Sequence, residues 1–311
     1  MGSVDTGKYI NINGVKQYIH ILSKNISNPI LVYLHGGPGD AALPLVKHFN
    51  SPLSEHYTLV IWEQRGSGKS YYPFSEKENI TLETFIEDLK SLIEYLLLKF
   101  RKENVYLLGH SWGSIIGLNF TIRYPELIKA YIGCGQVTNG QRVLEECKEF
   151  VLKHTNSKSK KEKIISINTS FKQENWYKEL IYLMNRVVKY GGSLYGRSSY
   201  NSLYPYFLFS KDYSLTNCIN RLKGSEQSLK YLWSEVCNTI FHEFTYFETP
   251  VIFIEGTKDC HCSSKIVDEF YSKIESQKKL FWIENSAHFP QWSNADKFNN
   301  ILAIIKHEYG D

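Results

Sequence analysis

Buried strands recur along the chain as short and nearly continuous apolar runs. Six such runs lie at residues 29–34, 57–62, 104–109, 129–134, 250–256 and 279–284. A strand that is covered by helices on both faces has few polar positions, so these runs are typical of a parallel sheet. Residues 8–22 instead alternate polar and apolar positions around Asn13-Gly14. That alternation indicates an antiparallel hairpin.

Helical patterns separate the strands. Residues 81–100 carry apolar side chains at steps of three and four, and Thr81 can cap such a helix. The alternation predicts an α/β fold with a doubly wound, mostly parallel sheet and the hairpin at its edge. From 137 to 245 the buried runs stop, and helical stretches rich in aromatic and charged residues follow. We therefore expect a core domain of residues 1–136 and 246–311, with residues 137–245 inserted as a helical cap.

Composition excludes some classes of protein. The 311 residues are 42% hydrophobic, and 36 basic and 32 acidic side chains give a net charge of +4. This near balance predicts no nucleic-acid partner. No apolar run approaches the roughly 18 residues of a membrane span, and the chain starts without an apolar leader, so we expect a cytoplasmic protein with no membrane partner. The six cysteines lack regular spacing and indicate free thiols. The oligomeric state stays open.

One strand end carries a motif with chemical meaning. Gly109-His110-Ser111-Trp112-Gly113 ends a buried run and opens a helical pattern. A tight turn at this point leaves no room for side chains at 109 and 113, so glycines permit a strained serine whose hydroxyl stands clear of the backbone. A hydroxyl becomes a good nucleophile when a base removes its proton, and the base needs an orienting carboxylate. The motif therefore predicts a nucleophile at Ser111 and its two partners at later strand ends.

Asp259 and His288 are the candidate partners, since each follows one of the last two buried runs. The order serine, acid, histidine, with each residue on its own strand-end loop, is typical of hydrolases with such a sheet. Two alternatives are weaker. Asp268 falls within a helical pattern, and His261 follows the acid too closely to face it. We predict a catalytic triad of Ser111, Asp259 and His288.

Attack on a carbonyl group creates negative charge on its oxygen, which backbone N–H donors can stabilise. The glycine-rich stretch 34–40 ends the first parallel run and lets the backbone approach a substrate. We expect the N–H of Gly37, with Gly36 as the alternative, to act together with the N–H of Trp112. The Cys-His-Cys run at 260–262 lacks the second pair that a structural zinc site has, so we predict no metal and no cofactor.

Several stretches of the chain resemble motifs of the proline iminopeptidase family of α/β-hydrolases: HGGPG at 35–39, WEQRGSGKS at 62–70, GHSWGS at 109–114, Asp259, and SAHFPQW at 286–292. The resemblance implies an α/β-hydrolase fold with an inserted helical cap. It also implies a serine enzyme that removes the N-terminal residue, often proline, from a short peptide. Carried over by motif, the triad is the one predicted above, and Gly37 and Trp112 form the oxyanion hole.

Members of that family bind the substrate's free amino group with carboxylates from the cap and from the neighbourhood of the catalytic acid. Residues 209–215 resemble this part of the cap, which makes Asp212 a candidate carboxylate and Tyr213 a candidate aromatic wall. Cys260 stands where some relatives carry glutamate. This departure leaves three functions open: an aminopeptidase acting on small peptides, a carboxylesterase or amidase acting on uncharged acyl compounds, or a ligand receptor on a hydrolase scaffold.

Overall fold

The centre of the molecule is an eight-stranded sheet in the order β1-β2-β4-β3-β5-β6-β7-β8. The structure, a computed structural model, describes residues 2–170 and 172–310. Its strands are β1 (Val4–Ile12), β2 (Val15–Ser23), β3 (Ile30–Leu34), β4 (Thr58–Glu63), β5 (Val105–His110), β6 (Ile128–Cys134), β7 (Val251–Gly256) and β8 (Lys278–Ile283). β2 runs antiparallel to both β1 and β4, and the other neighbouring strands are parallel. The mostly parallel sheet with an edge hairpin is therefore confirmed.

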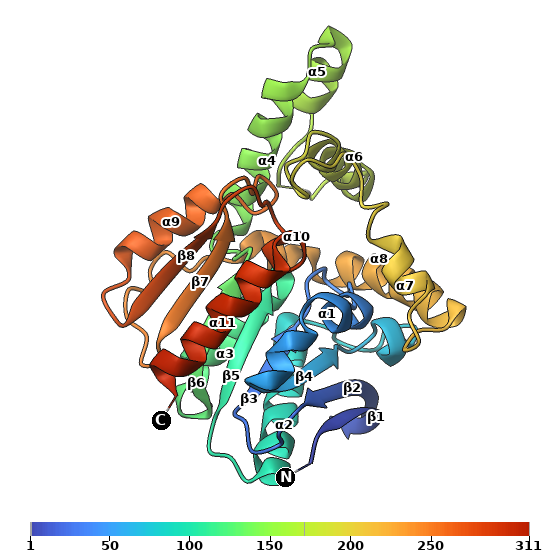
Figure 1. Cartoon of the computed structure of the whole chain (residues 1–311). Coiled ribbons are helices and arrows are strands. Elements are labelled where there is room, and N and C mark those ends of the chain that lie inside the picture. Colours follow the sequence, from blue (N-terminus) through green and yellow to red (C-terminus); the bar gives the residue numbers. More distant parts are fainter. Residues whose placement is uncertain (1, 171, 311) are drawn as a thin grey trace.

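Helices cover both faces of this sheet (Figure 1). The core helices are α1 (Leu43–Phe49), α2 (Leu82–Phe100), α3 (Trp112–Arg123), α9 (Ser264–Lys273), α10 (Pro290–Ser293) and α11 (Ala295–Tyr309), with short 3-10 turns η1 (Ser51–Glu55), η2 (Gly68–Ser70) and η3 (Pro125–Leu127). Along β5, Leu107 packs into one apolar cluster with α2 and α3, whereas Leu108 packs into another with α1 and α11. Burial on both sides explains why the strands are continuously apolar.

The predicted helix start at Thr81 is also present. Thr81 precedes the first residue of α2, and its backbone N–H donates to Oγ1 of Thr84 at 3.2 Å. This bond satisfies a backbone donor that the helix itself cannot pair. Within the described ranges, no helix combines the length and apolarity that crossing a bilayer requires.

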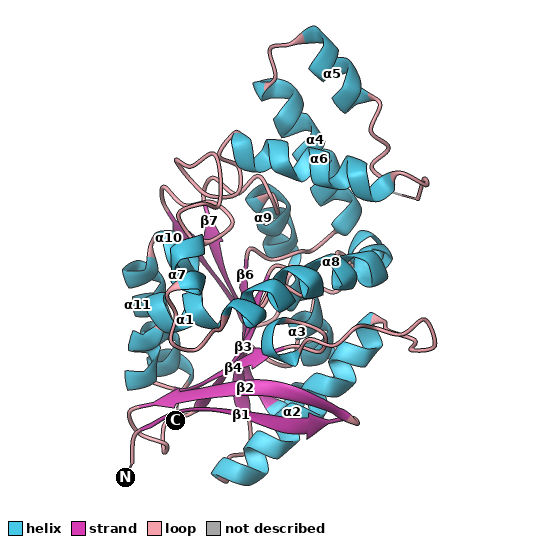
Figure 2. Ribbon diagram, turned by 90° about the vertical axis from the view of Figure 1, so that its right-hand side faces the viewer, coloured by secondary structure: helices cyan, strands magenta, loops and turns pink. Residues whose placement is uncertain are grey.

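Helices occupy the interval between β6 and β7. They are α4 (Gly140–His154), α5 (Lys158–Ile165), α6 (Trp176–Lys189), α7 (Tyr204–Leu208) and α8 (Leu215–Asn238). We call residues 137–245 the cap. Figures 1 and 2 show α5 projecting away from the body of the molecule, while α8 crosses above the core near α1 and α3. The cap thus stands over the edge of the sheet at which the parallel strands end.

Candidate active site

Ser111 lies in the sharp turn between β5 and α3, with φ 53° and ψ −120°. Residues that carry a side chain avoid this region of backbone conformation. The flanking glycines have no free space. A Cβ atom at Gly109 would lie 2.5 Å from the carbonyl oxygen of Gly113, and one at Gly113 would overlap the carbonyl group of Leu34. The steric reason that the sequence suggested for these two glycines is therefore confirmed.

Asp259 and His288 are joined at the ends of β7 and β8. Nδ1 of His288 donates to Oδ2 of Asp259 at 2.8 Å, and Oδ1 accepts from the backbone N–H groups of His261 and Cys262 at 2.8 and 2.9 Å. Burial raises the pKa of Asp259, and the backbone donors oppose this shift. Burial lowers the pKa of His288, which keeps its imidazole neutral as a base requires.

Ser111 shares a cavity of about 280 Å³ with His288. Nε2 of His288 lies 4.0 Å from Sγ of Cys262, and this thiol also contacts the Ser111 side chain. In the part of the chain that the structure describes, the Ser111 hydroxyl makes no hydrogen bond to His288. Such bonds often tighten only when a substrate binds. The loops after β5 and β8 nonetheless bring Ser111 and His288 to one cavity, and the loop after β7 places Asp259 in hydrogen-bond contact with His288.

The predicted backbone donors lie around the same serine. Gly37 lines the main cavity and also a small apolar cavity of about 50 Å³ beside Ser111, and its φ of 125° is one that glycine tolerates. Trp112 opens α3, where the backbone N–H has no partner within the helix. Its indole Nε1 donates to Oε1 of Gln64 at 3.1 Å, which fixes the ring. An oxyanion hole formed by Gly37 and Trp112 stays a prediction, and this arrangement permits it. Gly36, the alternative donor, also lines the main cavity.

Two of the residues predicted to bind the substrate lie elsewhere. Oδ2 of Asp212 pairs with Nζ of Lys47 at 3.1 Å, and this ammonium group also pairs with Asp5 of β1. The Tyr213 hydroxyl donates to the carboxylate of Glu63, which is fully buried at the end of β4. Both side chains fasten the cap to the core. Neither belongs to the described residues that line the cavity with Ser111.

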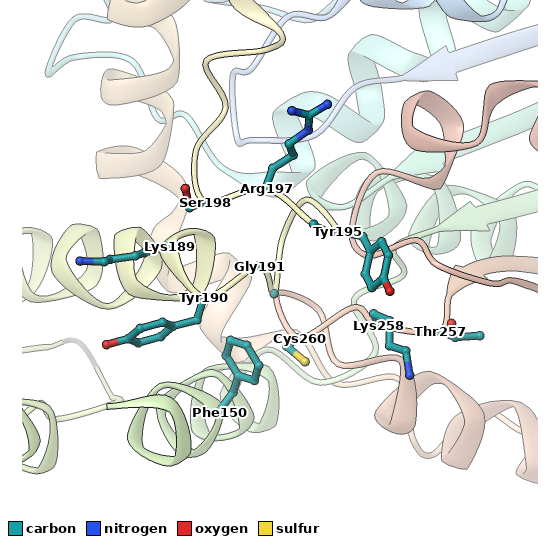
Figure 3. A pocket seen from close by; sticks show the side chains of 12 residues that line it. Phe150, Lys189, Tyr190, Gly191, Tyr195, Arg197, Ser198, Thr257, Lys258 and Cys260 are labelled. Atoms are coloured by element: carbon teal, nitrogen blue, oxygen red, sulfur yellow. The ribbon is translucent and has the colours of Figure 1, made fainter. Parts of the chain in front are cut away.

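Cys260, the third of these residues, faces a separate cavity. This space of about 530 Å³ lies between the cap and the loop after β7, and Figure 3 shows the Cys260 thiol there beside Phe150. Cys260 donates its backbone N–H to the carbonyl oxygen of Gly192 at 3.0 Å. The Cys-His-Cys run diverges, because His261 faces the main cavity and Cys262 faces the triad. Across the described ranges, no three His, Cys, Asp or Glu side chains are placed to hold a metal ion.

Two residues of the main cavity, Asp40 and His261, were given no role by the sequence analysis. Asp40 follows the glycine-rich stretch directly, lines the cavity, and pairs through Oδ1 with Nη2 of Arg221 from α8. Its position after a buried strand could have indicated a site residue. His261 stacks on His288, and its ring bonds to Ser193, whereas only its backbone N–H bonds to the acid Asp259. The loop turns sharply after Asp259, which lets one carboxylate hold both the backbone of His261 and the ring of His288.

Comparison with known proteins agrees with the observed fold. A family model described as alpha/beta hydrolase fold matches residues 29–295. The probable aminopeptidase YbaC of Bacillus subtilis is 32% identical over 309 residues, which cover 97% of this chain and 96% of the relative. The proline iminopeptidase of Thermoplasma volcanium is 23% identical and covers 94% of each chain. Among solved structures, the proline iminopeptidase-related protein of Thermus thermophilus has a TM-score of 0.69 over 98% of each chain, at 16% identity.

Proposed function

Because the chain belongs to the α/β-hydrolase fold family, we propose that it is a serine hydrolase that removes N-terminal residues from short peptides. Two observations support the proposal. Ser111 and His288 line one cavity, and Asp259 is hydrogen-bonded to His288. The chain is also similar over 97% of its length to a probable aminopeptidase. In this assignment Ser111 is the nucleophile, His288 is the base, and Asp259 orients the imidazole.

The reaction has two halves. Nε2 of His288 takes the proton of Ser111 while Oγ bonds to the carbonyl carbon of the first peptide bond, and the N–H groups of Gly37 and Trp112 receive the oxyanion. The imidazolium then gives its proton to the leaving nitrogen as the C–N bond breaks, which leaves an acyl-enzyme. Water, deprotonated by the same imidazole, releases the acid and restores the serine.

Asp40 is the reason for proposing peptides with a free amino group as the substrates. Among the described residues that line the main cavity, Asp40 is the only one with a carboxylate. The other walls are mostly apolar, and Trp233 and Leu229 of α8 and Met184 of α6 lie among them. A lone carboxylate in an apolar cavity next to the nucleophile favours a cationic group on the substrate. The small apolar cavity beside Ser111 suits a compact side chain such as the proline ring.

One observation favours the second candidate, a carboxylesterase or amidase acting on uncharged acyl compounds. The guanidinium group of Arg221 already pairs with Asp40, whose side chain is 36% exposed. A paired carboxylate attracts a second cation less strongly than a free one does. In that case Asp40 anchors α8 over the cavity and takes no part in recognising the substrate.

A substrate panel separates the two functions. We expect the protein to hydrolyse prolyl arylamides with a free amine faster than their N-acetylated forms or short aryl esters. Asp40→Asn should raise KM for the free-amine substrate by about 10- to 100-fold, since a hydrogen bond to a charged group is lost. Asp212→Asn is the matched control, because that carboxylate pairs with Lys47 outside the cavity, and it should leave KM unchanged.

Arg221→Met distinguishes recognition from anchoring. If Asp40 binds the amine, the Arg221 variant keeps the preference for the free amine. If Asp40 only anchors α8, the Asp40 and Arg221 variants lose activity equally on charged and uncharged substrates. Indifference of the wild-type protein to N-acetylation would reject the aminopeptidase and support the esterase. Full activity of Ser111→Ala on every responsive substrate would reject the serine mechanism altogether.

A further inference from the structure

Three histidine rings meet at the main cavity. The rings of His110 and His288 have centroids 4.8 Å apart, and Nε2 of His110 lies 2.9 Å from the carbonyl oxygen of His288. On the other side, the ring of His261 lies almost parallel to that of His288, at an angle of 10° and a centroid distance of 4.4 Å. The candidate base is therefore stacked on a second imidazole that the triad mechanism does not use.

His261 is held at its backbone and at its ring. Its backbone N–H donates to Oδ1 of Asp259 at 2.8 Å, while Oδ2 of the same carboxylate accepts from the ring of His288. Its ring nitrogen Nδ1 lies 2.8 Å from Oγ of Ser193. The parallel arrangement of the two imidazoles is thus fixed by the carboxylate of Asp259 and the hydroxyl of Ser193. A side chain pinned in this way restricts the angles that the neighbouring ring can adopt.

Ser193 belongs to the cap, in the loop between α6 and α7. Ser193 is completely buried, and its carbonyl oxygen accepts the backbone N–H of His288 at 3.0 Å. The preceding residue, Gly192, accepts the backbone N–H of Cys260 at 3.0 Å. Two consecutive cap residues therefore hold both the loop that carries the acid and the loop that carries the base.

We propose that His261, held by Ser193, is a positioning residue for His288. Through this contact the orientation of the base depends on how the cap packs against the core. The inference rests on the proposed serine hydrolase function, in which His288 must accept a proton from Ser111. An imidazole can turn about its Cβ–Cγ bond, and proton transfer requires Nε2 to stay aimed at the hydroxyl. The flat face of His261 blocks this rotation on one side.

Stacking and hydrogen bonding can be separated by substitution. His261→Phe keeps a flat ring against His288 and loses the bond to Ser193, whereas His261→Ala loses both. Ser193→Ala removes only the hydroxyl and keeps the backbone bond to His288. His154→Ala is the matched control, because His154 is a histidine of the cap that packs on the ring of Phe150 at 4.3 Å and does not line the main cavity.

The test is the rate at which an alkyl fluorophosphonate labels Ser111, measured from pH 5 to pH 9. Labelling needs the serine and its base, and it does not depend on the natural substrate. We expect His261→Ala to lower the labelling rate at pH 8 by about 10- to 100-fold, as a misplaced base would. We expect His261→Phe to stay within about threefold of wild type, because the flat ring remains. Ser193→Ala should fall between them, and His154→Ala should match wild type.

The pH profile distinguishes positioning from loss of structure. The titratable groups that face His288 are Asp259, His110, His261 and the thiol of Cys262. Removing the ring of His261 admits water to His288, so the acidic limb of the His261→Ala profile should move upward toward the ordinary histidine pKa of about 6.5. His261→Phe should leave the limb in place. A melting temperature measured for each variant identifies any that is unfolded.

Each outcome has one meaning. Wild-type labelling with an unchanged rate and pH profile in His261→Ala overturns the positioning role. Equal losses in His261→Phe and His261→Ala overturn it as well, since the polar edge rather than the stacked face would then be required. If His261→Ala does not fold, His261→Phe and Ser193→Ala still decide. Failure of the wild-type protein to react with the fluorophosphonate would instead reject the proposed serine hydrolase.

Discussion

Nδ1 of His288 donates to Oδ2 of Asp259 at 2.8 Å, and both side chains are almost completely buried. This bond keeps the proton on Nδ1, so Nε2 is the basic nitrogen that can serve Ser111. Asp259→Asn places an amide where the carboxylate stood, and its NH₂ group favours the opposite tautomer. We expect kcat to fall by about 10³- to 10⁴-fold with little change in KM, measured on any arylamide or aryl ester that the protein hydrolyses.

Asp268→Asn is the control for that variant. Asp268 is exposed on α9, nine residues after Asp259 in the sequence, and it does not line the cavity with Ser111. Its substitution should leave kcat within about twofold of wild type, as surface changes usually do. An Asp259→Asn protein that kept wild-type kcat would show that the imidazole is oriented by other groups.

The acidic limb of activity should lie below the ordinary histidine range. Burial lowers the pKa of His288 from 6.5, so the imidazole stays neutral as the pH falls from 8 to 6. Activity disappears only when this base takes up a proton at lower pH. The measurement is kcat/KM from pH 4 to pH 8, with circular dichroism at each pH to exclude unfolding. A limb centred at pH 7 or higher would contradict a buried, neutral base.

The sheet was predictable because each of its buried strands is an unbroken run of apolar residues in the sequence. Leu107 and Leu108 face opposite apolar clusters, so the strand that carries them has no polar side. The convergence of the loops that carry Ser111, Asp259 and His288 was predictable for a related reason, since parallel strands end at the same edge and the loops that follow them must converge. The catalytic roles of these three residues stay a prediction.

The substrate side of the cavity was not predictable in this way, because it depends on how the cap packs. Asp40 meets Arg221 only once α8 lies over the first glycine-rich loop. Asp212 is drawn instead to Lys47, 165 positions away along the chain. The stacking of His261 on His288 was not predictable either, because spacing along the sequence does not reveal how the loop after Asp259 turns. Side chains that pair across many residues of the chain leave no local pattern in the sequence from which the pair could be predicted.

Gly113→Ala tests the strained turn. A Cβ atom at this position would overlap the carbonyl group of Leu34 at the end of β3, which is backbone and cannot rotate aside. We expect the free energy of unfolding to fall by about 1–3 kcal/mol and fluorophosphonate labelling of Ser111 to be lost. The measurements are urea denaturation and intact-protein mass spectrometry after labelling.

Gly196→Asn is the matched change for that experiment. Gly196 also has a positive φ, 67°, but open space surrounds the position of its missing Cβ. Asparagine tolerates left-handed backbone, so stability should change by less than about 1 kcal/mol. Normal labelling in Gly113→Ala would mean that β3 can move away from the turn, contrary to the packing described above.

Tyr213→Phe tests the hydrogen bond between Tyr213 of the cap and Glu63 of the core. Burial raises the pKa of Glu63 from 4.5 to about 7, while the Tyr213 hydroxyl and the backbone N–H of Lys69 act in the opposite direction. The folded state thus binds a proton that the unfolded chain releases near pH 4.5, and the stability that Glu63 contributes is lost as the pH rises through 7. Removing the hydroxyl takes a donor from the ionised carboxylate, which raises its pKa further.

The loss of stability in Tyr213→Phe should therefore be larger at pH 8, where Glu63 is ionised, than at pH 5, where it is protonated. We expect the free energy of unfolding to fall by about 1–3 kcal/mol at pH 8, because a buried charged group loses a hydrogen bond, and by less at pH 5. Urea denaturation at the two pH values measures the difference. Tyr204→Phe, an exposed tyrosine of α7, should change neither value. Equal losses at both pH values would mean that Tyr213 stabilises the protein through packing of its ring rather than through Glu63.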